Sequence, residues 1–243
     1  MQSTALLRTL HFLRELWFDL LALLWPTSCV GCGYQDRDLC SSCACVVREV
    51  PEVHPEHLSA GPPYYVAGAY EGVVRDTLIA FKHDSAYGFV KPLGSRLGRV
   101  LRAACREAGA DPPLLVTIPS RRARVRSRGY RHVDELVRVA VRRERLPLDI
   151  VQALRVTRGR TGQVGLDADS RERNARRIAA RTGTQKFARR EVILVDDIVT
   201  TGATTRAACE VLERSGMRVI AIVALCHAVR KDSSQKTQLE EQG

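Results

Sequence analysis

The sequence predicts an α/β protein whose open parallel sheet is flanked by helices and preceded by a small module with four cysteines. Three observations support this class: apolar runs typical of buried strands alternate with helical patterns, two cysteine pairs lie near the N-terminus, and one apolar run ends in two acids and a small-residue loop. Alternating strands and helices are typical of parallel sheets. The 243 residues are sufficient for one sizeable core and a small accessory module.

Hydrophobic patterning places the secondary-structure elements. Short apolar runs are typical of buried strands, and apolar residues at helical spacing are typical of amphipathic helices. Polar stretches between them indicate a basic loop over 119–131 and a Gly- and Thr-rich mobile loop over 157–170. Strands are expected at 64–70, 114–118, 191–195 and 218–225, and helices at 73–83, 92–108, 132–143, 171–180 and 203–215.

Composition divides the chain into five segments. Four Pro residues among few core-like residues indicate a linker before the α/β domain. We expect an amphipathic N-terminal helix over 1–25, the four-cysteine module over 26–47, the linker over 48–63, the α/β domain over 64–228 and a polar tail over 229–243.

The N-terminal segment has its apolar residues at helical spacing. Charged residues interrupt it, so it is too polar to span a bilayer, and it lacks the small-residue cleavage site of a signal peptide. We expect a cytoplasmic protein whose N-terminal helix packs on its own domain, on a partner, or peripherally on a membrane surface. Its apolar residues are Leu6, Leu10, Leu13, Trp17, Leu20 and Leu24.

Charge is distributed unevenly. The net charge is +11, and residues 119–190 contain 21 Lys and Arg against 7 Asp and Glu. Such a basic block attracts polyanions such as nucleotides, pyrophosphate or nucleic acid, although a solvated Arg-rich surface is an equal alternative for any single Arg. Aromatic residues make up only 5%, which argues against a nucleic-acid binder that works by base stacking.

The N-terminal cysteines have the spacing of a metal site. Cys29, Cys32, Cys40 and Cys43 form the pattern C-x2-C-x7-C-x2-C. Each pair places two thiolates on one tight turn, and two such turns complete a tetrahedral sulfur site suited to structural Zn²⁺. Two disulfides are the alternative, which a cytosolic location disfavours.

The other four cysteines do not fit this pattern. Cys45 is a spare thiol beside the site, and its position two residues after Cys43 does not complete a pair of the required spacing. Cys105, Cys209 and Cys226 lie in apolar segments, where cysteine usually serves as a small buried hydrophobic residue.

The segment Val192-Ile-Leu-Val-Asp-Asp-Ile-Val-Thr-Thr-Gly-Ala-Thr204 carries the strongest functional signal. Open parallel sheets bind ligands at the carboxyl ends of their strands, and a helix N-terminus offers free N–H groups to a phosphate. Gly202 allows the backbone to approach a phosphate closely. The loop also contains three hydroxyl groups, on Thr200, Thr201 and Thr204.

Two adjacent acids, Asp196 and Asp197, lie between the strand and this loop. Adjacent carboxylates repel each other, and a helix N-cap needs only one of them. They can accept hydrogen bonds from ribose hydroxyls or hold Mg²⁺ through water. The segment therefore predicts a site for a phosphorylated sugar.

The segment from Asp196 to Thr204 resembles the motif by which type I phosphoribosyltransferases bind phosphoribosyl pyrophosphate (PRPP). With the cysteine pairs before it, the chain is similar to the ComF family over roughly 24–225. It departs from the family pattern at Arg128-Gly-Tyr-Arg-His132, where the family usually has Arg-Gly-Phe-Asn-Gln. Further segments that carry the resemblance are Leu24-Trp-Pro-Thr-Ser-Cys29, Tyr70-Glu-Gly-Val-Val-Arg75, Phe81-Lys-His83, Arg158 to Thr161, Gln163, Gly165-Leu166, Arg171 and Asn174.

The resemblance implies a type I phosphoribosyltransferase-like fold that binds PRPP with Mg²⁺. In an active enzyme, Asp196 and Asp197 hold the ribose and stabilise its cationic transition state, while a loop over 157–174 closes over PRPP. The implied PRPP-binding residues are Val195, Thr200, Thr201, Gly202, Ala203 and Thr204; the candidates for the pyrophosphate and flexible loops are Lys82, Arg121, Arg122, Arg158, Gln163 and Arg171.

Two functions remain open. The resemblance implies a PRPP-binding protein that acts in natural competence, in the handling of incoming single-stranded DNA, with helicase or recombination-mediator proteins as partners. The alternative is an active phosphoribosyltransferase in nucleotide or nucleoside salvage. The sequence does not identify an acceptor, and it shows no glutaminase domain.

Overall fold

A computed structural model describes residues 27–35, 37–51, 53, 55–56, 61–83, 87–109, 111–120, 125–126, 129–157 and 177–228. The predicted N-terminal helix and polar tail lie outside these residues. Within them, no helix is long and apolar enough to cross a membrane.

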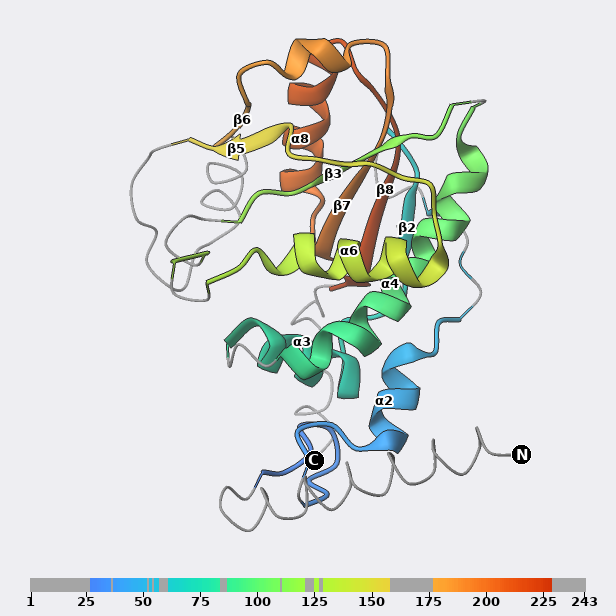
Figure 1. Ribbon diagram of the computed structural model, residues 1–243, viewed down its shortest axis with the longest axis vertical. Helices are drawn as coiled ribbons and strands as arrows, with labels where there is room; N and C mark the ends of the chain where they lie inside the picture. Colours follow the sequence, from blue (N-terminus) through green and yellow to red (C-terminus); the bar gives the residue numbers. More distant parts are fainter. Residues whose placement is uncertain are drawn as a thin grey trace, which may run out of the picture.

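A six-stranded sheet forms the centre of the protein (Figure 1). All its neighbouring strands pair in parallel except β1 and β2, which confirms the predicted parallel α/β class. A separate antiparallel pair consists of β5 (Leu154–Val156) and β6 (Ile178–Ala180). The order in the main sheet is β1 (Pro55–Glu56), β2 (Tyr64–Val66), β8 (Arg218–His227), β7 (Glu191–Val199), β3 (Leu114–Thr117) and β4 (Ile150–Val151).

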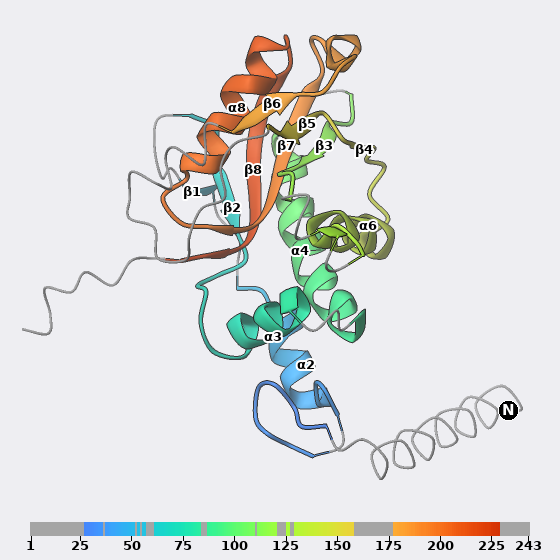
Figure 2. The same ribbon diagram turned by 90° about the vertical axis from the view of Figure 1, so that its left-hand side faces the viewer.

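Helices cover both faces of the sheet. In Figure 2, α8 lies on one side of β7 and β8, and α4 and α6 lie on the other. Short 3₁₀ helices η1 (Tyr87–Phe89), η2 (Cys105–Glu107) and η3 (Thr184–Phe187) complete the described elements. The α-helices are α2 (Ser41–Arg48), α3 (Gly72–His83), α4 (Val90–Ala104), α6 (His132–Glu144) and α8 (Ala203–Arg214).

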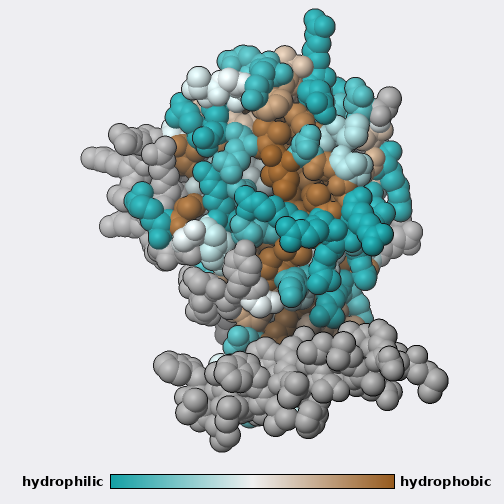
Figure 3. All heavy atoms as spheres, viewed as in Figure 1, coloured by the Kyte–Doolittle hydropathy of each residue, from teal (hydrophilic) through white to brown (hydrophobic). Residues whose placement is uncertain are grey.

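Side-chain alternation along β7 builds a separate core on each face of the sheet. Ile193 and Val195 join the cluster that contains the buried residues of α4 and α6. Val192 and Leu194 join the cluster that contains the buried residues of α8. This is the period of two expected for a strand buried on both faces. The outer surface of α6 is polar, and apolar residues are visible beside it over the sheet (Figure 3).

The cysteine module connects to the domain through α2. Val47 of α2 is fully buried in the same core cluster as α4 and α6. The buried guanidinium of Arg96, from α4, donates hydrogen bonds to the carbonyl groups of Val47, Glu49 and Ala67. Arg96 therefore joins the C-terminal end of α2 to the residue that follows β2.

The structure corrects several predicted elements. The strand that begins at Glu191 does not end before the acids but continues to Val199, because β8 also continues and pairs with it as far as His227. The predicted helix is wrong for 178–180, which form β6. Residues 55–56, within the predicted linker, pair with β2 as β1. The strand expected over 64–70 ends at Val66.

Candidate functional site

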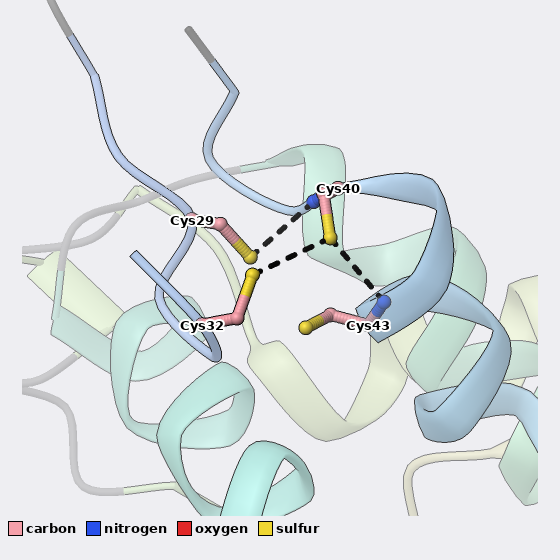
Figure 4. A group of neighbouring side chains, drawn as sticks. All are labelled: Cys29, Cys32, Cys40 and Cys43. Atoms are coloured by element: carbon pink, nitrogen blue, oxygen red, sulfur yellow. Dashed lines mark hydrogen bonds between the residues drawn. The ribbon is translucent and has the colours of Figure 1, made fainter. Parts of the chain in front are cut away.

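The four predicted cysteines converge in space. Their Sγ atoms lie within 4.8 Å of one another (Figure 4). Cys29 and Cys32 lie on a turn that is closed by a bridge between Ser28 and Gln35. Cys40 is the N-cap of α2 and Cys43 lies in its first turn. One turn and one helix start therefore supply the four sulfur atoms.

Hydrogen bonds and burial shift the pKa values of these thiols in opposite directions. The backbone N–H groups of Cys40 and Cys43 donate to the sulfur atoms of Cys29 and Cys40, each at 3.4 Å. Burial would raise the pKa of Cys29, but N–H groups directed at its sulfur outweigh burial and lower that pKa to about 6. Burial and the neighbouring thiols raise the pKa of Cys43 to about 12. A bound cation stabilises thiolates that lie this close together, because metal ions bind the deprotonated form of cysteine.

This donor set fits zinc. All eight cysteines are free thiols, so the disulfide alternative is not realised. Four sulfur ligands from two short loops match a closed, structural Zn²⁺ site. Cys45 lies outside the cluster, where its exposed thiol contacts Glu49. Cys209 and Cys226 are buried, as predicted.

The predicted phosphate loop lies between β7 and α8. Gly202 is the N-cap of α8 and has a φ of 71°, in the left-handed region that favours glycine. A Cβ atom at this position would lie 2.8 Å from the hydroxyl of Tyr64. That hydroxyl contacts Thr205 Oγ1 at 2.9 Å, and Thr205 in turn donates to the carbonyl of Gly202 at 2.8 Å. Tyr64 and Thr205 therefore hold Gly202 in place through these two contacts. Neither residue was predicted from the sequence.

The outward side of the loop is open to a ligand. Thr200, Thr201 and Thr204 are exposed. The first turn of a helix has N–H groups without intrahelical partners, and the helix dipole favours an anion beside them. Arg206 donates to the carbonyl of Thr201 at 2.7 Å, which holds this part of the loop in place. The arrangement can bind a phosphate group.

The acid pair lies just before this loop, inside β7. Asp197 is buried, and its Oδ2 lies 2.7 Å from Nζ of Lys82 and within hydrogen-bonding distance of Nε2 of His132. The other ring nitrogen of His132 lies 3.3 Å from Oγ of Ser120. Asp196 accepts a hydrogen bond from the backbone N–H of Asp197 at 2.8 Å. Lys82 was expected near the pyrophosphate, and the structure brings it to the acids.

The two carboxyl groups have opposite pKa shifts. Burial, followed by the charge of Asp197, raises the pKa of Asp196 well above its usual range. Burial would also raise the pKa of Asp197, but the charge of Lys82 and the hydrogen bond from His132 outweigh it and hold the pKa below its usual value. The ionised form is therefore favoured at Asp197 over Asp196.

The remaining predicted residues have different outcomes. The side chain of Val195 is fully buried in the core, so only its backbone is available near the site. His132 was missed as a contributor: it departs from the family pattern, but nothing in the sequence identifies its partner. Five of the cationic and amide candidates lie outside the described residues, namely Arg121, Arg122, Arg158, Gln163 and Arg171.

Comparison with known proteins identifies the family. The model of the phosphoribosyl transferase domain matches residues 99–241, more than half of the chain. The chain belongs to the phosphoribosyl transferase domain family. The fold is accordingly that of type I phosphoribosyltransferases, with the four-cysteine cluster added at its N-terminal side.

Individual relatives are similar over shorter or more divergent stretches. The adenine phosphoribosyltransferase of Kineococcus radiotolerans is 53% identical over 34 residues, which cover 14% of this chain and only 18% of that protein. The adenine phosphoribosyltransferase of Saccharomyces cerevisiae, solved with adenine and an imino-altritol bisphosphate, is 16% identical with a TM-score of 0.41, over 77% of this chain and 89% of that one. A hypoxanthine phosphoribosyltransferase from Staphylococcus aureus is 17% identical with a TM-score of 0.33, over 59% and 64% of the two chains.

Proposed function

We propose that this phosphoribosyltransferase-like protein binds PRPP, together with Mg²⁺, at the carboxyl end of β7. The observation that carries the proposal is the acid pair directly before a glycine-capped helix N-terminus, in a chain of this family. Carboxyl groups suit ribose hydroxyls, and the open helix start suits the 5′-phosphate. One site can therefore hold both ends of a phosphorylated ribose.

The site residues have separable tasks in this proposal. The N–H groups and hydroxyls of 200–204 bind the phosphate, and the acid pair orients the ribose. Magnesium, for which the acidic oxygens and the pyrophosphate oxygens are suitable ligands, supplies neutralisation of the leaving pyrophosphate. Arg121, Arg122, Arg158, Gln163 and Arg171 are retained as proposed pyrophosphate and flexible-loop contacts.

Isothermal titration calorimetry with PRPP and MgCl₂ tests this proposal. We expect binding in the wild-type chain and a loss of at least about 100-fold in affinity when Asp196→Asn and Asp197→Asn are combined, since charge-assisted hydrogen bonds are worth about 1.5–3 kcal/mol each. Glu210→Gln, an exposed acid farther along α8, is the matched control. Equal affinities in the wild type and the double variant would refute the site.

The biological role that we propose is the handling of incoming single-stranded DNA in natural competence. The support is the resemblance to the ComF family and the cysteine cluster before the domain. Exposed basic side chains of 119–190 are available for a polyanion, including Arg142, Arg143, Arg155, Arg181 and Lys186. Binding of a labelled oligonucleotide should weaken steeply with salt, because each neutralised phosphate releases counterions. Absence of binding at low ionic strength would argue against this role.

The alternative is turnover in nucleotide or nucleoside salvage with an unidentified acceptor. Pyrophosphate release from PRPP, measured with a panel of bases and amines and with and without single-stranded DNA, separates the two proposals. Release with one acceptor supports an enzyme. Binding of PRPP without release supports the non-catalytic function.

A further inference from the structure

A second pocket lies between β4, at the edge of the main sheet, and the segment that follows β6 (Figure 2). Its volume is about 370 Å³, and residues 150–152, 181–184, 186 and 187 line it. Small-molecule sites in proteins typically have volumes of about 300–1,000 Å³. None of the lining residues belongs to the acid pair or to the phosphate loop, so this pocket is a separate candidate site.

Hydrogen bonds within the chain hold one wall of the pocket in place. The backbone N–H of Arg181 donates to the carbonyl of Ala153 at 2.8 Å. The hydroxyl of Thr184, a residue only 2% exposed, lies 3.2 Å from the same carbonyl and donates to that of Arg181 at 2.7 Å. The turn over 181–184 is therefore tied to the segment after β4. A wall that is already ordered loses little conformational entropy when a ligand binds.

Gln152 forms part of the opposite wall, and its amide group is held at both ends. The amide nitrogen donates to Oδ2 of Asp134 at 3.0 Å, and the amide oxygen accepts from Arg131 at 2.9 Å. Asp134 is buried and also accepts from the hydroxyl of Thr117 at 2.6 Å. An amide group has two donor hydrogens and two acceptor lone pairs, so one of each remains for a ligand. This combination suits the hydrogen-bonding edge of a nucleobase.

The charge around the pocket is positive. Arg181 and Lys186 line it, both are exposed, and none of the nine lining residues is acidic. Within the described ranges of the chain, neither cation forms an ion pair. Nζ of Lys186 lies 4.9 Å from the centre of the Phe187 ring, which places a positive charge beside an apolar side chain. Cations that lack an internal counter-charge favour a phosphate group.

The pocket also has an apolar lining. Ile150, Val151 and Phe187 are half-buried and pack against the two cores of the domain. Such side chains can contact the flat face of a base, as aromatic and apolar side chains do in nucleic-acid sites. An acyl chain would leave the amide of Gln152 without a partner. The combined lining therefore suits a flat polar ring that carries a phosphate.

We propose that this pocket binds a nucleoside monophosphate unit, either a free nucleotide or one nucleotide of a single strand. Arg181 and Lys186 bind the phosphate, the apolar lining contacts the face of the base, and Gln152 contacts its edge. The inference goes beyond the proposed binding of PRPP and does not depend on it.

Isothermal titration calorimetry of the full chain with AMP tests the role of the two cations. Combining Arg181→Gln with Lys186→Gln should lower the affinity for AMP by at least about tenfold, because charge-assisted hydrogen bonds to the phosphate are lost. Lys91→Gln combined with Arg99→Gln is the matched control, since it removes the same charge from exposed positions on α4. The control should bind AMP as the wild type does. Equal losses in both variants would overturn the proposal, because they would show attraction by net charge alone.

A bulky substitution tests the pocket without changing its charge. Thr182→Trp places a large ring in the pocket and should abolish AMP binding. Gln185→Trp is the control: Gln185 is exposed and nearby in the chain, but it does not line the pocket. This control should keep the wild-type affinity, and thermal melting checks that both variants are folded. Retained binding in Thr182→Trp would overturn the proposal.

Two measurements on the wild type locate the bound nucleotide independently of any variant. AMP should shift the backbone amide NMR signals of 181–187 and leave those of 200–204 unchanged. Its affinity should also be the same with and without saturating PRPP and MgCl₂. Shifts confined to 200–204, or displacement of AMP by PRPP, would overturn the proposal. If PRPP itself fails to bind, the function proposed above fails, while the AMP results still decide whether this pocket is a site.

A competition experiment distinguishes the two sources of the nucleotide. A labelled single-stranded oligonucleotide is titrated into protein saturated with AMP. Displacement of AMP assigns the pocket to a nucleotide of the strand, and AMP that stays bound assigns it to a free nucleotide. Absence of AMP binding to the wild type at low ionic strength would overturn the proposal.

Discussion

The cysteine cluster and the acid pair collect negative charge in different ways. Four sulfur atoms converge within 4.8 Å, an arrangement that could hold a metal ion as their counter-charge. The acid pair receives its counter-charge from the chain, through Lys82 at Asp197, and His132 adds a hydrogen-bonding partner to the same carboxylate. From this difference we expect the folded form of the first region to depend on a bound ion, and the second region to be held by contacts within the chain.

Removal of zinc should have the largest effect and would test this comparison most directly. We expect purified protein to contain about one zinc per chain, and Cys40→Ser to lose it, because structural zinc sites contribute about 10 kcal/mol or more to folding in zinc-finger peptides. Hydrogen exchange of the α2 amides should then approach that of an unfolded segment. Metal analysis and exchange measured by mass spectrometry check both outcomes.

Cys45→Ser is the matched control for this experiment. Cys45 lies in α2, five residues after Cys40, which caps that helix, but its thiol is outside the cluster. The control should keep its zinc and its protected amides. Loss of zinc in both variants would show that the four-sulfur assignment is wrong, and folded, metal-free wild-type protein would remove the contrast between the two regions.

Arg96→Met should have the next largest effect, because Arg96 connects the cysteine side of the molecule to the sheet. The substitution leaves the carbonyl groups of Val47, Glu49 and Ala67 without their donor. We expect a loss of about 2–4 kcal/mol in the free energy of unfolding, measured by urea denaturation, since buried acceptors would remain unsatisfied. A change below about 0.5 kcal/mol would mean that the two regions are stabilised separately.

The phosphate loop allows a sharper test through a pair of glycines. Gly202 and Gly183 both have positive φ, at 71° and 81°, but an added Cβ meets the Tyr64 hydroxyl at Gly202 and no atom within 4 Å at Gly183. Gly183→Ala should therefore cost about 1 kcal/mol from backbone strain alone, and Gly202→Ala about 1–2 kcal/mol more. Equal losses of unfolding free energy for the two variants, measured by urea denaturation, would show that the Tyr64 side chain moves aside at no energetic cost.

Glu191→Gln should change stability least. Glu191 lies outside both regions. Glu191, at the opposite end of β7, accepts from the backbone N–H of Gly109 and pairs with Arg218; the N–H is the larger cause of its lowered pKa. A lowered pKa in the folded state stabilises the protein at neutral pH, and this stabilisation disappears as the pH falls through that pKa. The variant should be about 0.5–1 kcal/mol less stable at pH 7. The difference should shrink as the pH falls below the usual pKa of a glutamate, and a difference that does not change with pH would contradict the electrostatic origin.

The sequence predicted local features of both regions better than their long-range contacts. The spacing of the cysteines and the small-residue loop before α8 are encoded within 15 consecutive residues or fewer, so their geometry follows from turn and helix chemistry. The partners of Asp197 are not encoded in a short stretch of sequence. His132 lies 65 positions away in the chain, and no periodicity indicates which buried acid it meets.

Short strands account for most of the missed fold. The elements β4, β5 and β6 contain two or three residues each, too few to show alternation. The end of β7 was missed for another reason: two acids ordinarily end a buried strand, but here Lys82 supplies a counter-charge that allows β7 to continue. Tertiary contacts thus override local preference at the residues on which the proposed function depends.

Helix α3 contacts both the cysteine cluster and the acid pair. Val73, in its first turn, packs against the cysteine cluster, and Lys82, near its last residue, pairs with Asp197. The 12 residues of α3 form a rod of about 18 Å. Substitutions at residues this far apart with no shared partner ordinarily have additive effects on the free energy of unfolding. A double-mutant cycle between Val73 and Lys82 therefore measures directly whether this helix couples the two regions.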